Sequence, residues 1–243
     1  MIHTGTDRSY RLSCVRHADE HRFQVVVEES DLWVTALTDL RADMALTLTR
    51  LRADLKNWIL LYPEFQTSLA PLPVPGQAPK IVRRMSQAAA IAHVGPFAAV
   101  AGAVAQIIAE EFIEQSPELI IENGGDVYIC SRRPRAVGLL AGPYGEPALT
   151  VAVRAENCPV SFCASSARIG HSLSFGKSDL VVVRAKDAAL ADACATALGN
   201  LLRSADHIPD VLKRAQNLAR HGIEGVFAQC EGKLGLWGNM ELA

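Results

Sequence analysis

Pairs of short apolar runs joined by tight turns recur along the chain, and they restrict its fold more than any other feature. Residues 23–28 and 32–38 flank Glu-Ser-Asp, and residues 119–130 hold two runs around Asn-Gly-Gly-Asp. A third pair occupies residues 225–237. Turn residues between β-prone runs are typical of hairpins. We therefore expect pairs of antiparallel strands near both ends of the chain and in its middle.

Helical patterns alternate with these hairpins. Apolar residues recur at steps of three and four over residues 44–62, and Pro63 ends the pattern. A second helix is expected to begin at Pro96, where proline suits the first helical turn, and to reach about Gln115. Further helices are expected at residues 188–203 and 209–220, strands at 137–140, 149–153 and 180–184, and a polar loop at 157–178.

This order lacks the regular strand-helix-strand spacing of a parallel sheet, so it predicts an α+β fold. The chain, residues 1–243, is expected to form a single domain. The repeated order of hairpins and helices leaves open two structurally related halves, at about 1–131 and 132–243.

Charge and apolar segments exclude several classes of partner. A formal net charge of -2 without a basic block argues against nucleic acid. The apolar run at residues 88–109 is broken by His93 and by Gly95-Pro96, so it indicates a buried helix and not a membrane span. Because residues 1–14 have no apolar core, we expect no signal peptide and a cytoplasmic protein. Alanine-rich helices and the apolar content favour a homodimer.

The helix expected after Asp187 carries the first candidate site. Asp192 and Thr196 lie one turn apart on the side opposite its apolar stripe, and Gly199 and Arg203 continue that line. A carboxylate and a hydroxyl so placed form a hard-oxygen pair suited to Mg²⁺ or Ca²⁺. The alternative is a solvated helix face, because two-ligand fragments of this kind are common.

The polar loop before residue 180 carries the second candidate site. Hydroxyls, cations and backbone N–H groups beside small residues suit a phosphate. The spacing of a P-loop is absent, and His171 could equally be a structural histidine. The loop's candidate residues are Ser165, Ser166, Arg168, His171, Ser172 and Lys177.

Four segments taken together resemble a known group of proteins. RMSQAAAIAHVGPFAAVAGAVA, IENGGDVY, SSARIGHSLSFGKSD and LADACATALGN resemble, in this order, the uncharacterised ApbE-related family, most strongly over residues 85–200. ApbE proper is an FAD:protein FMN transferase that uses Mg²⁺ and attaches FMN to a serine or threonine of a target protein. The resemblance implies an ApbE-like fold, with antiparallel sheet and helices in a duplicated T-fold-like arrangement.

The resemblance also implies roles for residues of this chain. Asp192 and Thr196 would hold Mg²⁺ against a pyrophosphate, and His171 and Asp126 would be catalytic. His171 matches the ApbE histidine by its position, although the His-x-x-Asp-Pro of ApbE is absent. The residues expected to contact FAD or a similar ligand are Asn123, Gly124, Gly125, Ser165, Ser166, Arg168, Ser172 and Lys177.

Two functions follow as alternatives. The first is Mg²⁺-dependent binding of a flavin or other pyrophosphate nucleotide, with FMN transfer as its furthest form. The second is an accessory role in sulfide assimilation without transferase activity. It would use Cys158 and Cys163, which bracket a proline in the expected loop. Either function requires a small-molecule ligand and neither requires nucleic acid or a membrane.

Overall fold

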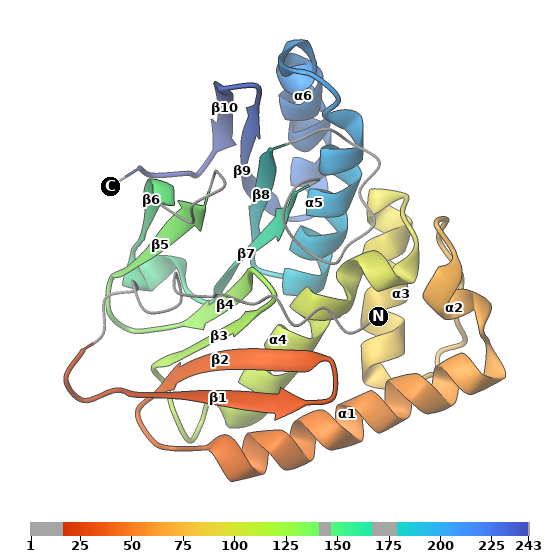
Figure 1. Cartoon of the computed structure of the whole chain (residues 1–243), viewed down its shortest axis with the longest axis vertical. Helices are drawn as coiled ribbons and strands as arrows, with labels where there is room; N and C mark the ends of the chain where they lie inside the picture. Colours follow the sequence, from red (N-terminus) through yellow and green to blue (C-terminus); the bar gives the residue numbers. More distant parts are fainter. Residues whose placement is uncertain (1–16, 141–146, 167–178, 243) are drawn as a thin grey trace.

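The computed structural model describes residues 17–140, 147–166 and 179–242. Eight strands form one antiparallel sheet in the order β1-β2-β3-β4-β7-β8-β9-β10, and β5 and β6 form a separate pair (Figure 1). The strands are β1 (His21–Val27), β2 (Ser30–Ala36), β3 (Leu119–Asn123), β4 (Asp126–Cys130), β5 (Arg135–Leu140), β6 (Pro147–Val153), β7 (Val160–Ser165), β8 (Leu180–Ala185), β9 (Ile223–Cys230) and β10 (Lys233–Gly238).

The helices are α1 (Arg41–Leu61), α2 (Glu64–Thr67), α3 (Lys80–Ala92), α4 (Val100–Phe112), α5 (Ala188–Leu201) and α6 (Ile208–Leu218). Short 3-10 turns join several elements, among them η2 (Pro96–Ala99) before α4. The predicted α+β class is confirmed, and so are the three hairpins, which are β1–β2, β3–β4 and β9–β10. The two related halves and the duplicated T-fold arrangement stay predictions.

The two faces of the large sheet belong to separate apolar cores. Val181 and Val183 of β8 pack in the core that contains the helices, whereas Val182 packs in the core closed by β5 and β6. Because both faces are covered, every residue of β8 is buried, which explains the apolar run over residues 180–183; Arg184, which follows, is buried and paired with Glu224. On β7, Cys163 belongs to the helix-side core. The candidate site lies on this side of the sheet.

The periodic pattern near the start of the chain forms α1, as predicted. Its buried residues include Met44, Leu48, Leu51 and Leu55, at the spacing of one helix face. Tyr62, which continues the pattern, lies past the end of the helix and is 42% exposed. The pattern therefore identified the buried face and overran its end by one residue.

The predicted helical start at Pro96 is confirmed, although the segment is divided into η2 and α4 and a further helix, α3, precedes it. α3 comes first and ends before His93, whose φ of 60° is left-handed. Pro96 then begins η2, and α4 follows from Val100. The break between α3 and η2 falls at His93 and Gly95, where the sequence already interrupts the apolar run. Within the described ranges no single helix is long and apolar enough to cross a membrane. The segments Lys80–Ala92 and Pro96–Phe112 reach that length and composition only when they are taken together, and they are bent by 103° relative to each other.

The prediction of one continuous loop over residues 157–178 is wrong, because Val160–Ser165 forms β7. This strand lies in the middle of the sheet, between β4 and β8. Small and hydroxyl-bearing side chains made the segment look like a loop. Ser161 is tolerated in the interior because its hydroxyl donates to the Ala185 carbonyl at 2.8 Å.

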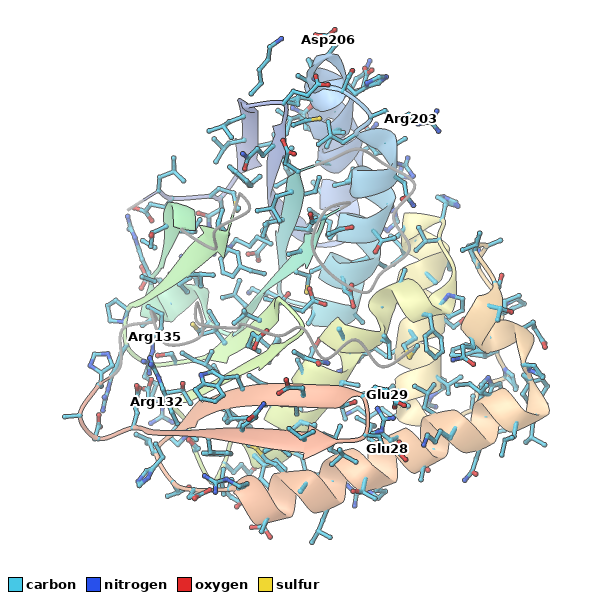
Figure 2. All side chains as sticks on the ribbon, in the orientation of Figure 1. Glu28, Glu29, Arg132, Arg135, Arg203 and Asp206 are labelled. Carbon is cyan, nitrogen blue, oxygen red and sulfur yellow. The ribbon has the colours of Figure 1, made fainter. Side chains whose placement is uncertain are left out.

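Two clusters of charged side chains, which include Glu29 and Arg135, link neighbouring elements by ion pairs (Figure 2). Glu29, in the turn between β1 and β2, pairs with Arg52 of α1. Arg135, at the start of β5, is buried and pairs with Glu20 and with Glu118, the latter at 2.7 Å. Both arginines are engaged by carboxylates, so these clusters are structural links and not the candidate site.

Candidate functional site

The Asn-Gly-Gly-Asp segment is the turn of the β3–β4 hairpin. Gly124 and Gly125 have φ of 66° and 106°, a left-handed pair that strongly favours glycine. Glu122 Oε1 accepts a 2.8 Å hydrogen bond from the Gly125 N–H, and Asn123 Nδ2 donates to the Ala101 carbonyl at 3.1 Å. The turn is therefore braced by β3 and docked on the first turn of α4. No heavy atom of the described residues lies within 4 Å of a Cβ built on either glycine, so a ligand could approach the backbone there.

Two buried carboxyls meet beside this turn. Asp126 begins β4 and is 4% exposed, and its Oδ1 accepts from the Ala164 N–H of β7 at 2.9 Å. Asp192 of α5 is 9% exposed, and its Oδ2 accepts from the Gly102 N–H of α4 at 2.9 Å. The two carboxyls are close enough that each affects the ionisation of the other. Residues from β4, β7, α4 and α5 thus converge on a single acidic pair.

Burial governs the ionisation of this pair. It raises the pKa of Asp126 to about 7, and it raises the pKa of Asp192 well above its usual value, with the charge of Asp126 adding to the effect. Hydrogen bonds from the Ala164 and Gly102 amides oppose the rise because they favour the ionised forms. Two carboxylates in contact cannot both be ionised at low cost, so a cation-free pair retains a proton near neutral pH. A divalent cation would compensate both charges.

Asp192 also completes the start of α4. A helix leaves its first amides without intrahelical partners, and Ala99, the cap residue, has no side chain to accept from them. Asp192 reaches the Gly102 amide from α5, across 90 residues of sequence. The approach requires glycine, because a Cβ on Gly102 would stand 2.2 Å from the Ala188 carbonyl oxygen. The contact between the two helices therefore fixes the position of the carboxyl.

The four residues predicted to share one side of α5 differ in burial, because the first three are buried and Arg203 is exposed. Asp192 and Thr196 are each 9% exposed, so the alternative of a solvated helix face is wrong. Arg203 lies beyond the last residue of α5 and is exposed, at the outer end of the helix in Figure 2. A buried hydroxyl one turn from a buried carboxyl remains compatible with a hard cation.

The serines at the end of β7 are the described part of the predicted ligand loop. Ser165 is 4% exposed, and within the described part of the chain its hydroxyl has no hydrogen-bond partner. Strand alternation places it on the same face of β7 as Cys163. The Ser166 hydroxyl donates to the Asp179 carbonyl at 2.7 Å. The remaining predicted loop residues, Arg168, His171, Ser172 and Lys177, lie outside the described residues.

The two cysteines considered as loop thiols are in different places. Cys163 lies in β7 with no exposed surface, and its Sγ donates to the Ala188 carbonyl at 3.4 Å. Burial raises its pKa well above the usual value. Cys158, before Pro159, is partly buried, and burial raises its pKa too. Reactive thiols are accessible and have lowered pKa values, so the surroundings of these two do not favour the sulfur-handling alternative.

The donors around the acidic pair suit a hard cation. Across the described residues, no group of three or more His, Cys, Asp and Glu side chains is placed to hold a metal ion. The carboxyls of Asp126 and Asp192 are two oxygen donors, and Thr196, one helical turn from Asp192 on α5, offers a hydroxyl on the same helix face. Oxygen donors of this kind fit Mg²⁺, which keeps several positions for water and substrate phosphates. Sequence reasoning missed Gly102 and Ala164 because they act through backbone N–H groups, which leave no side-chain signal.

Comparison with known proteins agrees with this architecture. The sequence model of a family described as AbpE bacteria matches residues 14–236. A UPF0280 protein of Methanococcus aeolicus is 40% identical over 199 residues, which cover 78% of this chain and 79% of the relative. A UPF0280 protein of Methanocaldococcus jannaschii is 38% identical over 195 residues, covering 78% of each chain.

Solved structures show the same fold at much lower identity. The flavin transferase ApbE from Vibrio cholerae has a TM-score of 0.60 and 10% identity, with 92% of this chain and 98% of that chain covered. The apo form of the Pseudomonas stutzeri flavinyl transferase ApbE has a TM-score of 0.60 and 13% identity, with 90% and 94% covered. These likenesses show an ApbE-like fold.

Proposed function

This chain belongs to the AbpE bacteria family and is a relative of the UPF0280 proteins, and from that premise we propose that it binds a divalent cation, Mg²⁺, together with a flavin or another pyrophosphate nucleotide. The observation that carries the proposal is the buried Asp126–Asp192 pair at the junction of the Gly-Gly turn with α4 and α5. Without a metal ion the buried pair of carboxyls retains a proton, and a bound cation could replace that proton.

Each element of the site has a role in this proposal. Asp192, Thr196 and Asp126 would hold Mg²⁺, which supplies charge compensation to a bound pyrophosphate. Gly124 and Gly125 would let the ligand approach the backbone of the turn closely, with the Gly125 N–H itself held by Glu122. Hydroxyls and cations from the end of β7 and the segment after it complete the proposed contacts: Ser165, Ser166, Arg168, Ser172 and Lys177.

The finer form of the proposal is FMN transfer. FAD would break at its phosphoanhydride, the FMN phosphorus would be attached to a serine or threonine oxygen of a target protein, and AMP would leave. Asp126 is proposed to orient the attacking hydroxyl, and His171 to take up its proton. The fold shared with flavin transferases supports this form, and AMP release on addition of FAD and a target would test it.

The ligand proposal is tested by titrating FAD, ADP and FMN into the full chain with and without Mg²⁺. We expect Mg²⁺-dependent binding of FAD and ADP, which contain a pyrophosphate, and weaker binding of FMN, which does not. Asp192→Asn should weaken Mg²⁺-dependent binding by about tenfold or more, because a charged ligand of the cation is lost.

Asp210→Asn is the matched control, because Asp210 is exposed on α6 and its substitution removes the same charge. It should leave every affinity unchanged. The proposal fails if none of the three nucleotides binds, or if binding needs no metal and is the same in Asp192→Asn.

A further inference from the structure

Gln106 of α4 makes a second contact with α5 that the proposed site does not use directly. Its side chain is 7% exposed, and its Oε1 accepts from the Ala188 N–H at 2.7 Å. Ala188 is the first residue of α5, so this amide is one that the helix cannot satisfy itself. In the reverse direction, Asp192 of α5 accepts a hydrogen bond from the Gly102 N–H of α4 at 2.9 Å. Each helix therefore supplies a cap to the start of the other.

The other end of the Gln106 amide is also held. Its Nε2 donates to Glu110 Oε1 at 3.0 Å. Lys80 and Arg84 of α3 bind the Glu110 carboxylate at 2.8 and 3.0 Å, and although burial opposes it, they keep the pKa of Glu110 below its usual value. The amide thus has a fixed orientation, with its oxygen directed to Ala188. A charged anchor on α3 sets where α5 begins.

The start of α5 determines where Asp192 lies. Ala188 precedes Asp192 by one helical turn, and its carbonyl is the atom that packs against Gly102. Asp187 caps only the Leu190 amide, at 2.9 Å, so the Ala188 amide depends on Gln106. A change at this contact would let α5 slide or turn on α4 and would move the Asp192 carboxyl away from Asp126.

We propose that Gln106 is a positioning residue for the cation site: by holding the Ala188 amide it sets the Asp192 carboxyl opposite Asp126. This inference rests on the proposed function, because it assigns Asp192 to a cation. Gln106 itself contacts neither the cation nor the nucleotide. Partners that orient metal ligands in this way contribute to affinity without touching the metal.

The test compares Gln106→Leu, which removes both hydrogen bonds, with Gln106→Glu, which keeps an oxygen acceptor for Ala188 and, because a buried carboxyl in contact with Glu110 retains a proton, can still donate to Glu110. Mn²⁺ alone is titrated into the full chain, with free Mn²⁺ followed by electron paramagnetic resonance. Gln106→Leu should weaken Mn²⁺ binding about tenfold or more, and Gln106→Glu should stay within about threefold of the wild type. Hydrogen exchange of the Ala188 amide, measured without metal, should be faster in Gln106→Leu and restored in Gln106→Glu.

Gln87→Leu makes the same substitution on the exposed face of α3 and should change neither readout. Wild-type Mn²⁺ affinity in a folded Gln106→Leu overturns the proposal, and so does an equal loss in both Gln106 variants. If Gln106→Leu does not fold, a folded Gln106→Glu decides: retained affinity supports the proposal and a tenfold loss overturns it. If the wild type binds no Mn²⁺, the proposed function itself fails and the positioning role falls with it.

Discussion

Gly102→Ala is expected to lower the free energy of unfolding by about 2 kcal/mol or more, because overpacking costs about 3 kcal/mol and the better helix propensity of alanine returns only about 1. The new Cβ would stand 2.2 Å from the Ala188 carbonyl oxygen, 2.7 Å from its carbon and 3.0 Å from the Asp192 Cβ. Two of these atoms are backbone, so relief requires α4 and α5 to separate. The same movement would take the Asp192 carboxyl away from Asp126. We therefore expect weaker nucleotide binding as well as lower stability.

Urea unfolding of the two proteins measures this effect. Gly76→Ala is the matched control, because nothing lies within 4 Å of a Cβ at Gly76. It should be neutral or should stabilise the protein by less than about 1 kcal/mol through the unfolded chain. A Gly102→Ala protein with wild-type stability and wild-type Mg²⁺-dependent binding would contradict the helix contact described for this site.

Asp126→Asn is expected to stabilise the metal-free protein at pH 8, by about 3 kcal/mol. Burial raises the pKa of Asp126 from 3.8 to about 7, so between these values the folded state holds a proton that the unfolded chain has released. Stability therefore falls as the pH rises through this window, and above it the folded state contains a buried ionised carboxylate at Asp126. Asparagine is uncharged at every pH, so it buries no charge, and its side-chain oxygen can still accept a hydrogen bond from the Ala164 amide.

Unfolding curves at pH 5 and pH 8 in the presence of a chelator test this prediction. The advantage of Asp126→Asn should be partial at pH 5, which lies inside the window, and full at pH 8. Adding Mg²⁺ at pH 8 should stabilise the wild type more than the variant, since only the wild type has two carboxyl groups that can bind the cation as carboxylates. Asp210→Asn should follow the wild type at both pH values. A variant that is less stable than the wild type at pH 8 without metal would be the opposite of the expected result.

Much of the fold could be predicted because its strongest sequence patterns are local. α1 follows from apolar residues at helical spacing, and the β3–β4 turn follows from Gly124 and Gly125, whose left-handed φ values few other residues adopt. β7 could not be predicted in this way, since it is buried on both faces and therefore shows no alternation. α3 was not predicted as a separate helix, although the break after it falls at His93, one of the residues that interrupt the apolar run in the sequence.

The site was only partly accessible to sequence reasoning. Asp126 and Asp192 were each weak candidates by spacing alone, and their contact is visible only when β4 and α5 are packed together. Gln106 gave no signal, because its role is to accept from a backbone amide 82 residues away. The loop residues after Ser166, the catalytic role of His171 and the homodimer stay predictions.

The exchange of caps between α4 and α5 has a consequence for the order in which this protein acquires its structure. Neither helix has a complete beginning until the other is present, and their partners are separated by 82 and 90 residues. During synthesis α4 leaves the ribosome well before α5, and closing so long a loop costs chain entropy before any contact repays it. The acidic pair is therefore expected to be assembled late, in the same cooperative step that joins the first and second parts of the sheet.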